Sequence, residues 1–191
     1  MGTSVNQRSP DTTNWRIVQR AYEDPNFPAE RALKEIWRAA TNQPQGDLAA
    51  QLGEPAIAAF ADVAIASSSP AEAAREAGRV IAETKCASLA ADIARRAAVQ
   101  SAGRENPREA FAQRLFAEAT NYLVSRDLPG HIGANERLDS VSAAREFRQR
   151  LTGLAAQAAL SSPGPVEYGG QAWTAYVRSV LEGISGRRPR S

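Results

Sequence analysis

The sequence predicts an all-α protein, a single-domain bundle of about six to eight helices with no sheet. Three observations lead to this prediction. Alanine supplies 38 of the 191 residues, and alanine loses little entropy on entering a helix. Apolar residues recur at intervals of three and four along most of the chain, which is the spacing of one helix face. No run of alternating β-branched or aromatic residues favours a strand.

The chain divides into one predicted domain and two short tails. Residues 1–11 are polar and lack a pattern, so we expect a flexible N-terminal tail. Residues 12–186 form the helical domain, which is long enough to bury a core without a disulfide or metal. Residues 187–191 form a basic C-terminal tail. We expect no signal peptide and no membrane-spanning segment.

A proline-containing break at residues 24–28 separates the first two helices. One face of the first helix, which begins at residue 12, is formed by Trp15, Val18 and Tyr22. Pro28 suits the first turn of the second helix, because its missing N–H costs nothing there. The face of that helix, which stops near residues 42–46, is formed by Leu33, Ile36, Trp37 and Ala40.

Two helix starts follow in the next segment. Asp47 caps a short turn that ends at Gly53. Pro55 opens a helix whose apolar face contains Ile57, Phe60, Ala61, Ala64 and Ile65. The sequence Ser69-Pro70-Ala71-Glu72 then predicts a capping box, in which the serine oxygen accepts a helical N–H and the glutamate bonds back toward the cap.

The apolar pattern of residues 70–102 predicts one long helix. The apolar face changes phase near residues 84–86, so two helices with a kink are the alternative. We favour the continuous helix because no proline or glycine pair occurs at the change. Gly103 is free to take the left-handed conformation that ends a helix.

Three further segments complete the predicted bundle. Asn106 and Pro107 begin a helix that runs to about Ser125 and carries Phe111, Leu115, Phe116, Ala119, Tyr122 and Leu123. Residues 126–139 form a loop that exceeds the usual connection length. Asp139 or Ser140 caps the next helix, with Ala144, Phe147, Leu151, Leu154, Ala155 and Ala158 on one face. The last helix ends at Gly186 and carries Trp173, Val177, Val180, Leu181 and Ile184.

Composition argues against most catalytic chemistry. The chain has one histidine, His131, and one cysteine, Cys86, the side chains most often used for proton transfer and nucleophilic attack near neutral pH. We expect His131 to be an ordinary loop residue and Cys86 to be a small buried hydrophobe. We expect no cofactor, and zinc would need more Cys and His ligands than the chain holds.

Arginine outnumbers lysine by 21 to two, with a net charge of +2. This bias is typical of a GC-rich, bacterial-like genome, but guanidinium groups also recognise phosphates. Acids three or four residues before arginines indicate solvated helix faces, as in Glu72–Arg75, Glu76–Arg79 and Asp92–Arg95. The candidate polyanion contacts are Arg145, Arg148, Arg187, Arg188 and Arg190.

The leading functional prediction is a non-enzymatic helical module for protein–protein interaction, an adaptor or a subunit of a cytoplasmic assembly. Its partner is another protein or a second copy of the chain. The candidate interaction loop contains Arg126, Leu128, His131 and Ile132. One alternative is a nucleic-acid-associated subunit that uses the arginines against phosphates. Another is a small-ligand binder or enzyme that uses the 126–139 loop around His131.

Overall fold

Helices contain 84% of the residues that the structure describes, and no strand occurs among them. The computed structural model describes residues 12–41, 47–85, 88–133, 137–162 and 170–185. The predicted all-α, single-domain fold is confirmed. Both predicted tails, residues 1–11 and 187–191, lie outside the described residues.

The described residues form nine α-helices and one 3₁₀ turn, η1. This number of helices is higher than the predicted six to eight. The excess arises because the turn after Asp47 is a short helix and because the 70–102 segment is divided. In chain order the elements are α1 (Thr12–Glu23), α2 (Ala29–Thr41), α3 (Leu48–Leu52), α4 (Pro55–Ala66), α5 (Pro70–Thr84), α6 (Leu89–Ser101), α7 (Pro107–Asp127), η1 (Leu128–His131), α8 (Val141–Ser161) and α9 (Gly170–Ser185).

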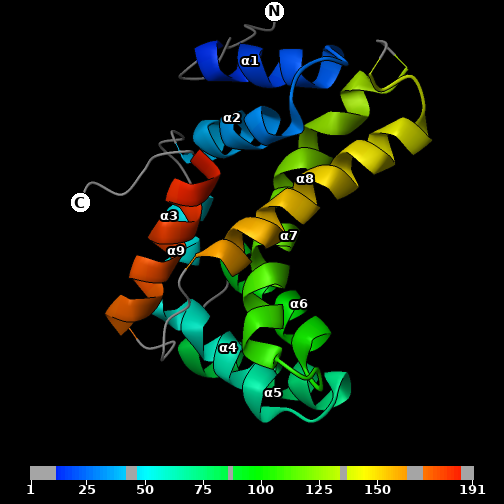
Figure 1. Cartoon of the computed structure of the whole chain (residues 1–191). Helices are drawn as coiled ribbons and strands as arrows, with labels where there is room; N and C mark the ends of the chain where they lie inside the picture. The colour runs from blue at the N-terminus through cyan, green and yellow to red at the C-terminus, as the bar shows by residue number, and fades with distance from the viewer. Residues whose placement is uncertain (1–11, 42–46, 86–87, 134–136, 163–169, 186–191) are drawn as a thin grey trace, which may run out of the picture.

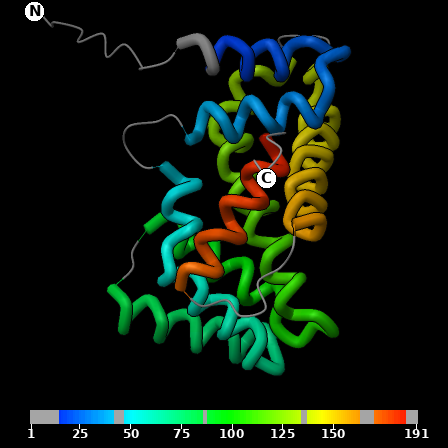
Figure 2. The backbone as a smooth tube through the Cα atoms, turned by 60° about the vertical axis from the view of Figure 1, so that its left-hand side comes forward, coloured from blue at the N-terminus to red at the C-terminus, as the bar shows by residue number. Residues whose placement is uncertain are grey.

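Helix α7 occupies the centre of the arrangement. It packs most extensively against α6 and α8, and it also contacts α2 and α4. Figure 1 shows α1 and α2 across one end of the α7–α8 pair and α4, α5 and α6 at the other end. Figure 2 shows α9 on one side of this framework, where it contacts α2, α3, α4 and α8.

Large side chains of α7 meet small side chains of its neighbours. Phe111, Leu115 and Phe116 of α7 are fully buried. The core residues of α6 and α8 are mostly alanines: Ala90, Ala91, Ala94, Ala97, Ala98, Ala144, Ala155 and Ala159. Because the distance between packed helices depends on the side chains at the contact, these alanines permit a close approach to α7.

Three buried hydrogen bonds connect one helix to another. Trp37 Nε1 donates to Thr120 Oγ1 at 3.1 Å and joins α2 to α7. Trp173 Nε1 donates to the Leu52 carbonyl at 2.8 Å, and Tyr176 Oη donates to the Ala159 carbonyl at 3.0 Å. These bonds let the large aromatic side chains be buried without an unsatisfied polar tip.

The predicted helix starts are confirmed at Asp47, Ser69 and Ser140, with one change and one exception. Glu72 accepts bonds from the Ser68 N–H and hydroxyl, both at 2.8 Å, instead of from the cap residue itself. Ser140, not Asp139, caps α8 by accepting from the Ala143 N–H at 3.2 Å. Helix α7 begins at Pro107, as predicted, but Asn106 before it forms no side-chain cap bond.

The continuous helix predicted over residues 70–102 is also wrong. Helix α5 ends at Thr84, and Lys85 takes the left-handed conformation with φ of 51°. Ser88 then caps α6 by accepting from the Ala91 N–H at 3.1 Å. The phase change in the apolar pattern therefore marks two helices that each turn a face to the core. Cys86 lies outside the described residues.

Two apolar residues predicted on buried faces are exposed. Ile65 and Tyr122 each expose 38% of their surface. Ile65 lies one residue before the end of α4. Tyr122 lies at the edge of the buried face of α7, because Ala119 and Leu123 take the core positions around it. Periodicity identified these helix faces but not where each face ends.

Leu151→Ala should lower the free energy of unfolding by about 2–5 kcal/mol, because Leu151 is fully buried in α8 and its truncation leaves a cavity. Leu160→Ala on the same helix is the matched control, because Leu160 is 44% exposed. We expect that control to change stability by less than about 0.5 kcal/mol. Chemical denaturation measures both values, and equal midpoints for the two variants would contradict the placement of this core face.

Glu72→Gln should remove a pH-dependent contribution to stability. Side-chain and backbone hydrogen bonds from Ser68 lower the pKa of Glu72. A carboxyl group with a lowered folded-state pKa stabilises the fold above its unfolded pKa, and the stabilisation is lost as pH falls through the folded value. The denaturation midpoint of the parent should exceed that of the variant at neutral pH, and the gap should narrow toward about pH 3. A constant gap would argue against this role.

Candidate functional site

The predicted 126–139 loop is shorter than expected. Helix α7 continues to Asp127, and Leu128 to His131 form η1. Leu128 is buried and Ile132 is partly buried. These two apolar side chains hold the turn against the body of the protein.

His131 packs against α1. Its ring centroid lies 5.1 Å from that of Tyr22, and its Nδ1 lies 3.7 Å from Glu23 Oε1. Burial, and then the charge of Asp127, raise the pKa of Tyr22 far above its ordinary value, so the phenol stays neutral at physiological pH. His131 thus belongs to a contact between α1 and η1.

Arg126 is occupied within the same contact. Its Nε and Nη2 donate to the two carboxylate oxygens of Asp127, each at 3.1 Å. The guanidinium carbon lies 5.0 Å from the centre of the Trp15 ring, in a cation–π arrangement. This arginine therefore connects α1 to the end of α7.

Arg137 is a positioning residue that sequence reasoning missed. Its Nη1 donates to the carbonyls of Asp24 and Phe27, at 2.8 and 2.7 Å. Its guanidinium carbon lies 4.0 Å from the centre of the Phe147 ring. Arg137 thus ties the turn between α1 and α2 to α8. No local pattern signals these contacts, because the bonded carbonyls are more than 100 residues away in sequence.

A groove between the end of α7 and the start of α8 combines residues from both predicted candidate sets. This α7–α8 groove has a volume of about 160 Å³. It is lined by Ser125, Leu128, Pro129, Ile132, Val141, Ala144, Arg145 and Arg148. Leu128 and Ile132 come from the candidate loop, and Arg145 and Arg148 come from the candidate polyanion contacts.

The α7–α8 groove is apolar with a basic edge. Val141, in the first turn of α8, is 65% exposed. Arg145 is exposed and Arg148 is partly buried. Neither arginine forms an ion pair with an acidic residue in the described part of the chain. The groove can therefore bury an apolar side chain and attract negative charge beside it.

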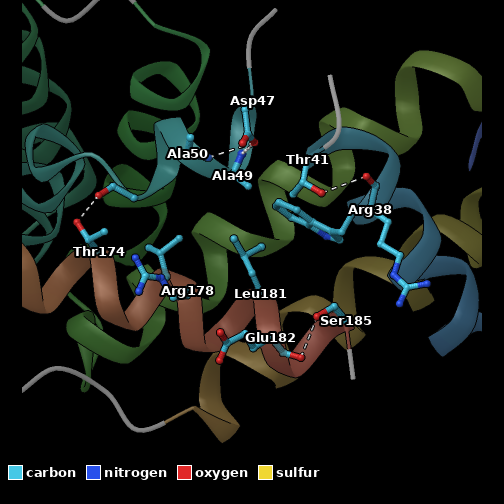
Figure 3. A pocket seen from close by; sticks show the side chains of 13 residues that line it. Arg38, Thr41, Asp47, Ala49, Ala50, Thr174, Arg178, Leu181, Glu182 and Ser185 are labelled. Carbon is cyan, nitrogen blue, oxygen red and sulfur yellow. Dashed lines mark hydrogen bonds between the residues drawn. The ribbon is translucent and has the colours of Figure 1, made fainter. Parts of the chain in front are cut away.

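A second groove, of about 830 Å³, lies between α2, α3 and α9 (Figure 3). Its polar side chains are largely used inside the protein: Asp47 accepts from the Ala49 and Ala50 N–H groups, and Thr174 Oγ1 donates to the Gly53 carbonyl at 2.7 Å. Arg178 and Glu182 line it with charges of opposite sign. The mixture does not favour a partner of either charge.

Other predicted functional features lie elsewhere or outside the described residues. His131 and Arg126 line neither groove. Arg187, Arg188 and Arg190 lie outside the described residues. Within the described ranges, no three His, Cys, Asp or Glu residues are grouped so that they could hold a metal ion. No helix among those residues is long and apolar enough to cross a membrane.

Comparisons with known proteins do not assign the chain to a family. No protein-family model matches the chain, and no curated protein or solved structure matches it.

Arg137→Lys should lower the free energy of unfolding by about 1.5–3 kcal/mol. The shorter lysine side chain cannot place a donor at the Nη1 position, which bonds both carbonyls, and also cover the Phe147 ring with a planar cation. Arg104→Lys is the control, because the Arg104 side chain donates a single bond, to the Gln100 carbonyl, on the exposed surface of the described structure. Thermal and chemical denaturation compare the two variants. Equal small effects would show that the Arg137 contacts contribute little to stability.

Proposed function

We propose that this protein is a non-enzymatic helical interaction module that binds an amphipathic helix of a partner protein in the α7–α8 groove. It serves as an adaptor or as a subunit of a cytoplasmic assembly. The observation that carries the proposal is Val141, which is 65% exposed beside the apolar side chains of Leu128 and Ile132. Covering such a patch removes apolar surface from water, which favours association.

The size of the groove favours a side chain of a partner over a small molecule. Its volume of about 160 Å³ is below the roughly 300–1,000 Å³ of typical small-molecule sites. One anchoring aliphatic side chain fits such a space better than a metabolite does. The flanking helices α7 and α8 offer ridges and grooves against which a partner helix can pack.

Nucleic acid remains the alternative occupant. Arg145 and Arg148 lie where they could contact phosphates. The groove beside them is apolar, however, and Glu146 and Asp139 add negative charge near the start of α8. An apolar groove with mixed charges around it favours a protein partner over a phosphate backbone.

The test uses three fluorescent helical peptides that share leucine anchors and have neutral, acidic or basic polar faces. Anisotropy should detect binding of at least one peptide with a Kd tighter than about 100 μM. Val141→Ser should weaken that binding about tenfold, because burying a valine contributes about 1.5 kcal/mol and each step of about 1.4 kcal/mol changes Kd tenfold. Val141 is exposed, so the fold should tolerate the change.

Leu160→Ser is the matched control, an equivalent loss of exposed apolar surface at the far end of α8. It should leave peptide binding unchanged. If no peptide binds, or if both variants behave alike, the proposal is wrong. A labelled DNA duplex and a single strand at physiological salt complete the test. Micromolar binding to either one, without peptide binding, would establish the nucleic-acid alternative instead.

A further inference from the structure

The charges along the α7–α8 groove restrict what its partner can be. Arg145 and Arg148 border the groove without an ion pair among the described residues. The neighbouring charges do not line the groove: Arg150 pairs with Glu30 at 3.6 Å, and Asp139 and Glu146 lie outside the lining. The unpaired charge that lines the groove in the described structure is therefore positive.

These features are ordered along α8. Val141, Arg145 and Arg148 follow one another at intervals of four and three residues, so they form one ridge on the same side of the helix. With a rise of about 1.5 Å per residue, the two arginines lie roughly 6 and 10 Å along the axis from Val141. Asp139 precedes Val141, at the opposite end of the ridge from the arginines. Negative charge on a partner is thus favoured only on the arginine side of the apolar contact.

We infer that the partner segment is an acidic amphipathic helix with one aliphatic anchor and carboxylates four and seven residues from it. This inference rests on the proposed function and specifies the partner class of the same groove. The anchor packs on Leu128, Ile132 and Val141. The two carboxylates pair with Arg145 and Arg148, at the same spacing that these arginines have from Val141.

The experiment compares isomeric peptides that have the same composition and net charge. In one isomer two glutamates lie four and seven residues from a leucine anchor, on the same face. In the other they lie two and five residues away, on the opposite face. Each isomer is made in two versions, one with the glutamates before the anchor and one with them after it, because a partner helix can lie along the groove in either direction. The same-face isomer in the favourable direction should bind about tenfold tighter, since each exposed ion pair contributes roughly two- to fivefold.

Arg145→Gln combined with Arg148→Gln should remove the difference between the isomers, and raised salt should reduce it. Arg150→Gln is the matched control, because Arg150 is on the same helix but pairs with Glu30 outside the groove. It should preserve the difference. Circular dichroism verifies that each variant remains helical.

The outcomes separate this inference from the proposed function. If both isomers bind equally and Val141→Ser still weakens them, the acidic partner is wrong while the groove remains the binding site. A difference that persists in the double variant also overturns the inference. If neither isomer binds and the neutral and basic peptides also fail, both the inference and the proposed function are wrong.

Discussion

The close packing of α7 between α6 and α8 is the constraint on which the rest of the structure depends. Only 6% of the residues are aromatic, so the core has few large side chains to distribute. The buried phenylalanines of α7 fill most of the space between the helices, and the alanines of the flanking helices let those helices lie close to α7. A larger residue at any of these alanines would overpack the core, because protein interiors have little free volume. Helices α7 and α8 pack against each other along this core, and the α7–α8 groove lies where η1 meets the start of α8.

Much of the fold could be predicted from local signals. Ser69 with Pro70 and Glu72 predicted a helix start correctly, because cap bonds form between near neighbours in sequence. The break at Lys85 was missed, because a left-handed non-glycine residue has no strong sequence signature. The phase change in the apolar pattern was visible, but without a proline or glycine it could not be distinguished from a broad buried face.

The candidate site was predictable only in parts. Leu128 and Ile132 were identified as apolar residues in a loop, and Arg145 and Arg148 as a basic row on a helix. Their meeting in one groove depends on tertiary packing, which no local pattern encodes. Val141 was missed because the regular apolar face of α8 begins at Ala144 and points into the core. The role of Arg137 was equally hidden, since its partners are backbone carbonyls and carry no side-chain signal.

The attachment of α1 has a consequence for the dynamics of the protein. This helix packs mainly on α2 and η1. Arg126 contacts Trp15 in its first turn, and His131 contacts Tyr22 in its last turn. An element with so few neighbours can open without unfolding α7, at a cost well below the global free energy of unfolding. Amide protons of α1 should therefore exchange with solvent sooner than those of α7. Native-state hydrogen exchange would resolve the protein into a peripheral cooperative unit and a central one.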